Sequence, residues 1–327
     1  MSAEDHVQVR RTKRPFFIVG TPRSGTTLLQ TMLTAGDGLY IAPETHFLPL
    51  TKFREKSYGR PQTDTGFENH VRQILSVSRR HELPVDLSTL KRELHDAERS
   101  YGGLFDTLLW HIQSRQPDCR RVGEKSPGHL LFVADLLEIF PDAKVITVIR
   151  DGRDVALSQR EAWGTLTVRA ALAWRRDQRL HNRYAKVLPS ARYTWVRYED
   201  LVNRPQDELR RLCHFLEEPF NEAMIRFHDR TDKGFPDRET HKEMTLRPLT
   251  AARVGRYRNH LTESQIAVFQ LLATRELQTL GYNVEPSSRM NGYLAAAREL
   301  PVLLWERAKW WRSIRRVHDE AADQDVR

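Results

Sequence analysis

Cysteine is scarce in this chain of 327 residues, which contains only Cys119 and Cys213. Two cysteines are too few for a disulfide framework, and no C-x-x-C pair offers a thiolate metal site. The sequence also lacks an apolar signal-peptide region within residues 1–14, and it has no run of about 18 apolar residues, the length that spans a bilayer. We therefore expect a soluble, cytoplasmic protein.

Acidic residues are outnumbered, since 52 Lys and Arg against 43 Asp and Glu give a formal net charge of +9. The cations are spread along the sequence, and no helix-turn-helix, finger or RNA-binding signature occurs. The excess charge suits anionic ligands, although a basic surface without a polyanion partner explains it equally well. We expect no nucleic-acid partner.

A glycine loop at residues 20–27 lacks the lysine of the common nucleotide-binding loop. Its sequence, G-T-P-R-S-G-T-T, lies between the apolar strand Phe16–Val19 and an amphipathic helix expected over Thr26–Thr34. Two glycines five residues apart allow a tight turn that points N–H groups and the helix N-terminus at one anion. In the pattern G-x-x-x-x-G-K-[ST], lysine would stand at Thr26 and contact the β- and γ-phosphates. The loop is predicted to hold a different phosphate group, with Arg23 supplying charge; an ordinary glycine turn is the alternative.

A second anion-binding element follows the run Lys144–Ile149, which is typical of a buried parallel strand. Ligands of open α/β sheets gather at the carboxyl ends of strands, so Arg150 is predicted to emerge at the edge where the glycine loop opens. Ser158 follows about two helical turns later. A guanidinium fork and a hydroxyl suit a phosphate monoester. Taken alone, Arg150 could instead be an ion-pair partner of Asp151 or Asp154.

Strands and helices alternate along most of the chain. This pattern predicts an α/β fold, a P-loop-type three-layer sandwich with a mainly parallel sheet and helices on both faces. One domain over residues 15–285 is expected after a flexible stretch at 1–14, with a helical insertion at 51–116. Residues 227–260 are polar and predict a mobile loop that orders over a ligand. Aromatic and basic residues at helical spacing in 286–327 predict an amphipathic extension that docks on the body or contacts a membrane surface.

These motifs together resemble the sulfotransferases that use 3′-phosphoadenosine 5′-phosphosulfate (PAPS). The likeness rests on three pieces of sequence: the loop Thr21–Thr27, the pair Arg150 and Ser158, and Tyr198–Leu201 after a later strand. It implies that PAPS donates a sulfuryl group to a hydroxyl or amine and that no metal ion is needed. Such a donor has no γ-phosphate, which accounts for the missing lysine. Arg23 stands where cytosolic members usually have lysine, so the chain looks closer to the bacterial and tyrosine-directed branches.

The resemblance also implies which residues bind the donor. The 5′-phosphosulfate would be held by Arg23, Ser24, Gly25, Thr26 and Thr27. The 3′-phosphate would be held by Arg150 and Ser158, and by a segment that resembles the family's Arg-Lys-Gly closing segment, namely Arg253, Gly255 and Arg256. That segment departs from the pattern at its middle lysine, and a solvated basic turn is the alternative.

Sulfuryl transfer requires a base for the acceptor's proton, positive charge at the leaving oxygen and in-line placement. Glu44 and His46 follow Pro43 at the end of a predicted strand and are the two base candidates. Glu44 is preferred because it resembles a glutamate of the tyrosine-directed and some bacterial enzymes. Chemistry leaves both open, since the ordinary pKa of histidine, about 6.5, suits neutral pH better than that of glutamate, about 4.3. Lys125 resembles a lysine near the donor's sulfonyl group and would stabilise the leaving oxygen with Arg23; an exposed turn lysine is the alternative.

Two other function classes stay open at the level of sequence. A P-loop kinase for small molecules shares the strand-loop-helix start, but it needs Mg²⁺ and usually the missing lysine. A non-catalytic nucleotide or polyanion binder would need only the basic charge and the mobile loop. No signature selects the acceptor among small molecules, carbohydrates, lipids and peptides, although an insertion at a strand's carboxyl edge is a natural place to recognise it. Nothing in the sequence specifies an oligomeric state.

Overall fold

The computed structural model describes residues 12–52, 55–229, 247–284, 293–294, 297–299 and 301. The chain divides into two compact units, which we call unit 1 (residues 1–149 and 183–251) and unit 2 (residues 150–182 and 252–327). The described strands all belong to unit 1: β1 (Phe16–Gly20), β2 (Leu39–Ala42), β3 (Arg121–Lys125), β4 (Lys144–Ile149) and β5 (Tyr193–Arg197). The prediction of one domain over residues 15–285 stays a prediction.

The described helices are divided between the units. Unit 1 contains α1 (Thr26–Thr34), α2 (Phe47–Lys52), α3 (Glu55–Tyr58), α4 (Asp64–Arg80), α5 (Leu87–His95), α6 (Tyr101–Ser114), α7 (Val133–Ile139), α10 (Tyr198–Asn203) and α11 (Pro205–Leu216). Unit 2 contains α8 (Gly152–Trp163), α12 (Tyr257–His260) and α13 (Glu263–Thr279), while α9 (Thr167–Val187) begins in unit 2 and continues into unit 1. Short 3₁₀ turns cover Pro127–Phe132, Glu222–Met224, Phe227–Asp229 and Ala251–Arg253.

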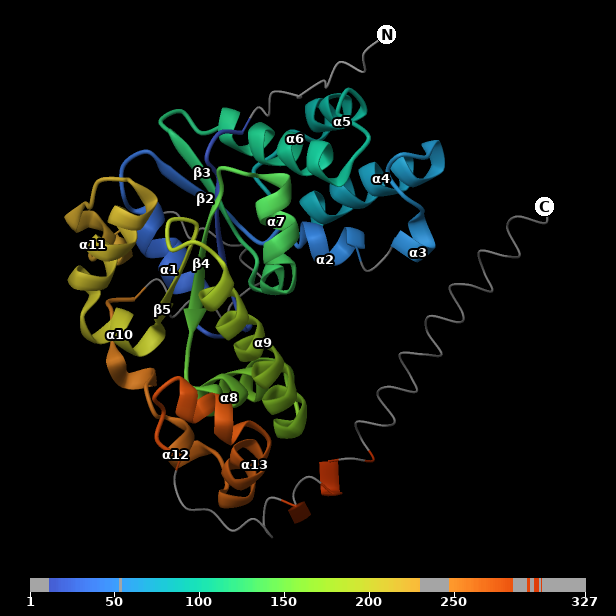
Figure 1. Ribbon diagram of the computed structural model, residues 1–327. Coiled ribbons are helices and arrows are strands. Elements are labelled where there is room, and N and C mark those ends of the chain that lie inside the picture. Colours follow the sequence, from blue (N-terminus) through green and yellow to red (C-terminus); the bar gives the residue numbers. More distant parts are fainter. Residues whose placement is uncertain are drawn as a thin grey trace. The chain divides into compact units, whose positions relative to one another are not determined.

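The sheet of unit 1 has the strand order β2-β3-β1-β4-β5, and every neighbouring pair is parallel (Figure 1). The predicted parallel sheet is therefore confirmed. Because all strands run the same way, the residues that follow them leave at one edge, the edge where open α/β sheets bind ligands.

Alternate residues of the central strand β1 pack on opposite faces of the sheet. Phe17 contacts Phe105 of α6 and Phe140 after α7, with ring centroids 5.9 and 5.6 Å apart. Phe16 and Ile18 belong to the apolar cluster formed with α1, α10 and α11. Each face is thus covered by helices, as the alternation of strands and helices along the chain predicted.

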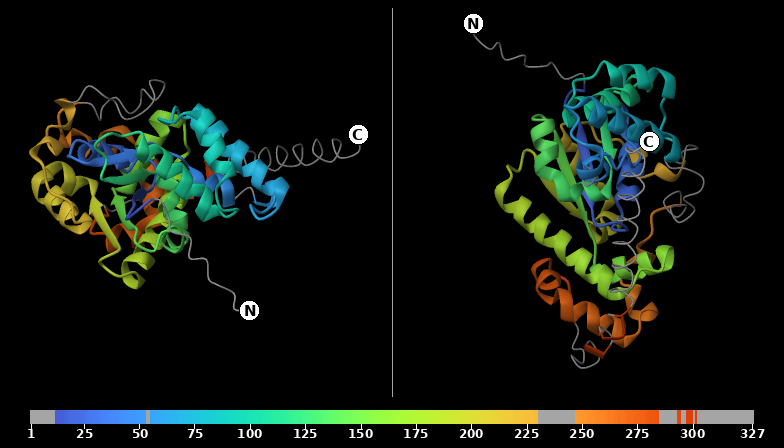
Figure 2. Two further views of the ribbon diagram at one scale, coloured as in Figure 1. Left: turned by 90° about the horizontal axis from the view of Figure 1, so that it is seen from above. Right: turned by 90° about the vertical axis from the view of Figure 1, so that its right-hand side faces the viewer.

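Helices α3–α6 occupy most of residues 51–116, where the helical insertion was expected, and α4, α5 and α6 lie together in both views of Figure 2. Each of these three helices begins at a polar cap. The side chains of Thr63, Asp86 and Ser100 accept the backbone N–H three residues on, at 3.1, 2.7 and 2.9 Å. Such caps satisfy N–H groups that a helix start would leave unpaired.

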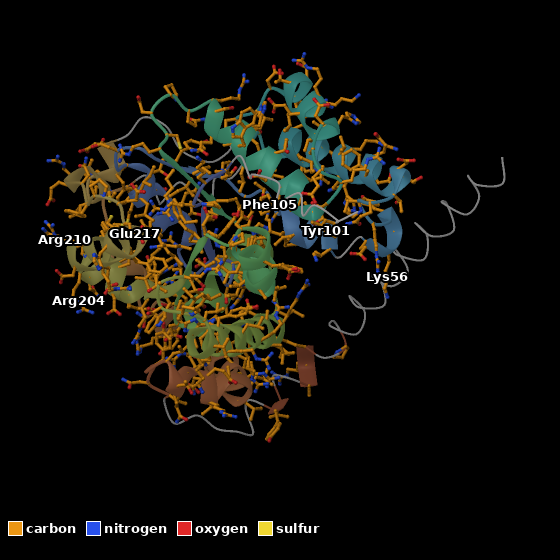
Figure 3. All side chains as sticks on the ribbon, turned by 45° about the horizontal axis from the view of Figure 1, so that its top comes forward. Lys56, Tyr101, Phe105, Arg204, Arg210 and Glu217 are labelled. Carbon is orange, nitrogen blue, oxygen red and sulfur yellow. The ribbon has the colours of Figure 1, made fainter. Side chains whose placement is uncertain are left out.

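Charged side chains cover α10 and α11, where Figure 3 labels Arg204, Arg210 and Glu217. Cations and carboxylates alternate here: Arg204 lies 3.0 Å from Asp200, and Arg210 lies 3.6 Å from Glu222. This surface is therefore not a basic block, in agreement with the spread of charge along the sequence.

Unit 2 is built around the start of α8. A Cβ on Gly152 would lie 2.3 Å from the Phe269 ring and 2.6 Å from the Trp174 ring, so only glycine fits this close approach. The Trp174 indole also donates to the carbonyl of Arg150 at 3.0 Å. These contacts fix the backbone at Arg150 relative to α9 and α13.

Three predicted segments lie partly outside the described residues. These are 1–14, of which 12–14 are described; 227–260, of which 227–229 and 247–260 are described; and 286–327, of which 293–294, 297–299 and 301 are described. Residues 247–260, the described end of segment 227–260, form helical turns in which Tyr257 is fully buried. It packs with Leu157 of α8, an apolar contact that the polar character of the segment concealed. No helix in the described ranges is both long and apolar enough to cross a membrane.

Acid should destabilise the protein partly through His181, whose burial in α9 lowers its pKa to about 4. The unfolded chain would then take up this proton first as the pH falls below about 6.5, so stability is lost from there down to about pH 4. We expect His181→Gln to reduce the loss of unfolding free energy between pH 7 and 4.5 by about 2 kcal/mol. Urea unfolding at both pH values measures this, and an unchanged acid loss would contradict it.

Candidate active site

The glycine loop between β1 and α1 has the tight geometry that its sequence predicts. Arg23 has φ of 76° and Gly25 has φ of 100°, the left-handed region. A Cβ on Gly25 would lie 2.5 Å from the Tyr198 ring, and one on Gly20 would lie 2.5 Å from the carbonyl oxygen of Val148. Both glycines are therefore required by close contacts with neighbouring elements.

The loop offers donors suited to an anion. No side chain in the described ranges caps the start of α1, so its first N–H groups and the positive end of the helix dipole face the loop. Ser24 is fully buried, and its Oγ has no hydrogen-bond partner among the residues the structure describes. A buried, unpartnered hydroxyl beside an uncapped helix start fits a bound phosphate or phosphosulfate.

The two base candidates and Lys125 lie together in unit 1. Lys125 Nζ donates to Glu44 Oε1 at 2.6 Å, and His46 Nε2 lies 3.2 Å from Glu44 Oε2. The Lys125 side chain is only 1% exposed, so it is not the exposed turn residue considered above, while Glu44 keeps 18% exposure. Glu44 is thus held between an ammonium and an imidazole, with part of its side chain open to solvent.

Strand register brings this group to the edge of the glycine loop. Ile18 of β1 pairs with Lys125 of β3, and Ala42 of β2 pairs with Glu124. Glu44 follows β2 by two residues, Lys125 ends β3 and the loop follows β1. Three neighbouring parallel strands therefore end in the residues for which the sequence predicted phosphosulfate binding and proton transfer.

His46 is held as a neutral imidazole. Burial lowers its pKa, and the opposing influence of Glu44 and Glu124 is smaller. A neutral ring with Nε2 facing a carboxylate donates from that nitrogen, which leaves Nδ1 as its acceptor. The contact makes His46 a hydrogen-bond donor to Glu44.

A buried network next to Glu44 was not apparent from the sequence. Glu124 is fully buried and accepts hydrogen bonds from Thr45, Ser126 and His129. Burial acts to raise the pKa of Glu124, but His129 and these hydrogen bonds hold it below its ordinary value. The signal that could have revealed this network is a glutamate within the short strand Arg121–Lys125, five residues before a histidine.

In unit 2, Arg150 lies against the segment that carries Arg253 and Gly255. Arg150 donates to the carbonyl of Arg253 at 2.6 Å and lies 3.9 Å from Asp154. Asp154 in turn accepts the N–H groups of Gly255 and Tyr257 at 2.7 and 2.9 Å. Burial raises the pKa of Asp154, although Arg150 and both N–H groups oppose the rise. The segment predicted to close over the 3′-phosphate is thus attached to α8 through its backbone.

Two further residues predicted for the 3′-phosphate also belong to unit 2. Ser158 is buried on α8, two turns beyond Arg150. Arg256 forms an ion pair with Glu161 at 2.9 Å. The Arg256 guanidinium is therefore engaged with a carboxylate, and among the cations predicted here Arg150 is the buried one.

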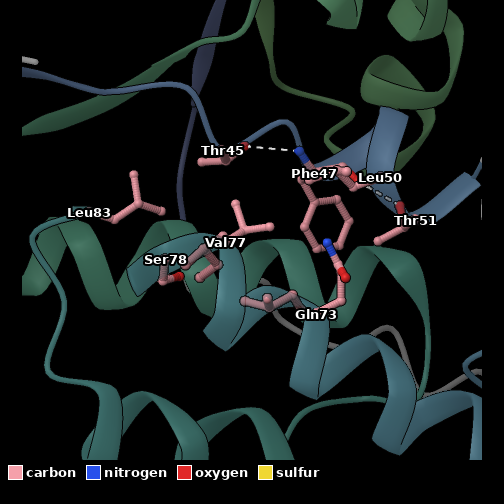
Figure 4. A pocket seen from close by; sticks show the side chains of 10 residues that line it. Thr45, Phe47, Leu50, Thr51, Gln73, Val77, Ser78 and Leu83 are labelled. Carbon is pink, nitrogen blue, oxygen red and sulfur yellow. Dashed lines mark hydrogen bonds between the residues drawn. The ribbon is translucent and has the colours of Figure 1, made fainter. Parts of the chain in front are cut away.

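A small cavity adjoins Thr45, between α2, α4 and α6 (Figure 4). Its walls are mostly apolar and include Phe47, Ile74, Val77, Leu83 and Leu108. Ser78 adds a buried hydroxyl that has no hydrogen-bond partner within the described part of the chain. The helical insertion therefore contributes a mixed apolar and polar surface next to the residue that follows Glu44.

Comparison with known proteins assigns the chain to a family. A model described as the sulfotransferase family matches residues 15–222. Protein-tyrosine sulfotransferase 1 of Danio rerio is 28% identical over 226 residues, covering 67% of this chain and 57% of that protein. The protein-tyrosine sulfotransferase of Drosophila melanogaster is 23% identical over 278 residues, covering 82% of this chain and 51% of that protein. The chain spans about half the length of these curated relatives.

Solved structures support the fold. The sulfotransferase domain from the olefin synthase of Synechococcus PCC 7002 superposes with a TM-score of 0.60 at 23% identity, covering 84% of this chain and 97% of that domain. The sulfotransferase domain from the curacin biosynthetic pathway gives a TM-score of 0.58 at 21% identity, covering 85% of this chain and 100% of that domain. The predicted P-loop-type α/β architecture is therefore confirmed.

Proposed function

Because this chain belongs to the sulfotransferase family, we propose that it transfers the sulfuryl group of PAPS to a hydroxyl or amine of an acceptor. The observation that carries this proposal is the ion pair of Lys125 and Glu44, 2.6 Å apart, at the strand ends next to the glycine loop. A proton acceptor and a buried cation then stand beside a phosphate-binding loop. The family match favours this function over a small-molecule kinase or a non-catalytic binder.

We propose that residues 15–285 form the catalytic domain and that separate residue sets bind the two ends of PAPS. In unit 1, Arg23, Ser24, Gly25, Thr26 and Thr27 would bind the 5′-phosphosulfate. In unit 2, Arg150 and Ser158 would bind the 3′-phosphate, with Arg253, Gly255 and Arg256 alongside. The orphaned Ser24 hydroxyl and the buried Arg150 support these assignments.

Each catalytic residue has a distinct proposed role. PAPS supplies the sulfuryl group and departs as adenosine 3′,5′-bisphosphate. Glu44 accepts the proton of the acceptor hydroxyl through its ionised carboxylate. Lys125, with Arg23, provides positive charge where negative charge grows on the leaving oxygen, and the low solvent exposure of Lys125 strengthens that effect. His46 orients Glu44 through its Nε2.

Ligand selectivity tests this proposal. Adenosine 3′,5′-bisphosphate should raise the melting temperature of the pure protein in EDTA, because binding to the folded state alone stabilises it and the proposed reaction uses no metal ion. ATP with Mg²⁺ should do little, since the loop lacks the lysine for a γ-phosphate. The reverse ranking would favour the kinase.

The acceptor is proposed by class. The relatives from Danio rerio and Drosophila melanogaster are named protein-tyrosine sulfotransferases, so a peptide tyrosine is the first class to test, before small molecules, carbohydrates and lipids. We propose that the protein acts in the cytoplasm. Incubating it with ³⁵S-labelled PAPS and host extract, and identifying the labelled product, tests both activity and acceptor.

Arg150→Ala should weaken binding of adenosine 3′,5′-bisphosphate by about 10–100-fold, the range expected when a charged hydrogen-bond donor is removed. Adenosine 5′-phosphate, which lacks the 3′-phosphate, should lose much less affinity. Calorimetry on both ligands measures the difference. Arg160→Ala is the matched control and should change neither; Arg160 lies in α8, the helix that follows Arg150, and donates to the Gln265 side chain at 2.8 Å. Equal losses for both ligands would refute the role of Arg150.

A further inference from the structure

The short segment that carries Glu44 is held by its own backbone. Residues 45–48 donate three N–H groups to side chains at the end of β3 and in the turn after it. Thr45 donates to Glu124 at 3.1 Å, His46 to Ser126 at 3.1 Å, and Leu48 to His129 at 3.2 Å. These acceptors lie about eighty residues further along the chain, and together they bind the backbone of Thr45, His46 and Leu48.

Glu124 is the centre of this arrangement. Its Oε1 accepts from the Thr45 hydroxyl at 2.9 Å and from the Ser126 hydroxyl, and its Oε2 accepts from His129 Nδ1 at 3.0 Å. With 0% exposure, such a carboxylate is tolerated only when its oxygens are well paired. The buried Glu124 carboxylate therefore accepts from the segment directly and also orients Ser126 and His129, the other two acceptors.

His129 transmits this orientation further along the segment. Its Nδ1 faces the Glu124 carboxylate and so carries the proton, which leaves Nε2 as an acceptor. That lone pair receives the Leu48 N–H at the start of α2. Exchange of Glu124 for a group that cannot accept from Nδ1–H would remove the reason for this tautomer.

Packing and backbone strain agree with a fastened segment. Phe47 stacks on Phe105 with ring centroids 4.3 Å apart and planes 4° from parallel. His46 has φ of 50°, a left-handed conformation that non-glycine residues seldom adopt and that persists only where its surroundings hold it. The turn next to Glu44 is thus maintained against its own preference.

We propose that Glu124, acting through Ser126 and His129, is a positioning residue that fixes Glu44 against Lys125. This inference rests on the proposed role of Glu44 as the base. Glu124 touches neither the donor nor the acceptor, and it acts by holding the backbone from which Glu44 extends. A base displaced by about 1 Å can lose about 10²-fold in rate, so the network matters to turnover far more than to donor binding.

Glu124→Gln should lower ³⁵S transfer from PAPS to the host-extract acceptor by about 10²-fold. Glutamate accepts at both oxygens, whereas glutamine has one acceptor oxygen and an NH₂ that can only donate. Either His129 Nδ1–H or the hydroxyl donors would then face a second donor, so the network has to rearrange. Affinity for adenosine 3′,5′-bisphosphate should stay at the wild-type value. Hydrogen exchange followed by mass spectrometry should show faster exchange in the peptide containing residues 45–48. Ser126→Ala, a smaller change, should show the same pattern with a loss of about tenfold, the cost of one ordinary hydrogen bond.

Glu93→Gln is the matched control. Glu93 pairs with His111 Nδ1 at 2.6 Å, and His111 Nε2 accepts the Asp86 N–H at 3.1 Å, the same chemistry applied to the start of α5. This variant should lose stability in urea unfolding without a comparable loss of transfer. Equal losses of transfer in both variants, at equal destabilisation, would overturn the proposal. So would unchanged exchange of residues 45–48 in Glu124→Gln. Wild-type protein that transfers no label would refute the proposed function, and the exchange data would still decide whether Glu124 holds the segment.

Discussion

Replacing Glu44 by Gln is expected to reduce sulfuryl transfer by about 10²–10⁴-fold, the range attributed to a positioned general base. In the wild-type protein Lys125 Nζ donates to Glu44 Oε1 at 2.6 Å. Glutamine keeps the size of the side chain and an oxygen that can accept from Lys125, but it cannot take up a proton. Binding of adenosine 3′,5′-bisphosphate should not change, because Glu44 is not among the residues proposed to hold the phosphates. Initial rates with ³⁵S-labelled PAPS and calorimetry on the same preparation provide the two measurements.

Two further variants separate the base from its neighbours. His46→Asn should lose far less activity, because a neutral imidazole that donates to Glu44 orients the base and does not replace it. Glu93→Gln, which alters another glutamate paired with a histidine, should leave transfer intact. If His46→Asn proved the more damaging change, His46 would become the base and Glu44 its orienting partner.

Replacing Lys125 by Met is expected to lower transfer by about 10²–10³-fold, the loss seen when one preorganised stabilising donor is removed. Methionine fills similar space in the buried position at the end of β3, so the substitution removes the charge without leaving a large cavity. The acceptor's proton would still have a carboxylate to receive it, but the growing negative charge on the leaving oxygen would lose its buried cation. Single-turnover rates at saturating PAPS isolate this step.

Lys144→Met is a control of the same kind, at the first residue of a strand, whereas Lys125 is the last residue of its strand. Lys144 opens β4 and donates to Glu217 at 2.6 Å, so this strand lysine also has a carboxylate partner at the same distance as Lys125 and Glu44. It should affect stability more than transfer. Comparable losses of transfer in both variants would show that Lys125 acts through the fold alone.

The parts of the structure that the sequence predicted well are those set by local patterns. The apolar run before Gly20 predicted β1, the two loop glycines predicted its tight turn, and Pro205 correctly began α11. Glu44 and Lys125 were singled out through a resemblance to a family, and their catalytic roles stay proposals. Their 2.6 Å contact could not be read from the chain, because it depends on β2 and β3 being neighbours in the sheet.

The parts that escaped prediction depend on pairing across long separations. In the sequence, Glu124 is one charged residue of a short motif. The N–H and the hydroxyl that it accepts from belong to Thr45, 79 positions away. The apolar spacing over residues 129–140 is typical of one continuous helix, but the structure has a 3₁₀ turn over Pro127–Phe132 and α7 begins only at Val133. In this turn His129 contacts both Glu124 and the Leu48 N–H. The spacing of apolar residues, from which a helix is predicted, carries no information on such contacts. Asp154 likewise showed its role only through the N–H groups of a segment a hundred residues on.

The division into two units has a consequence for protein engineering. The polypeptide crosses between them three times, after residues 149, 182 and 251. Neither unit can therefore be expressed as one uninterrupted fragment. A product truncated after residue 149 would lack β5 and turn β4 into an unprotected edge strand, which invites aggregation. Chimeras with related enzymes are best built by joining at matched pairs of crossings, so that every strand keeps its neighbour.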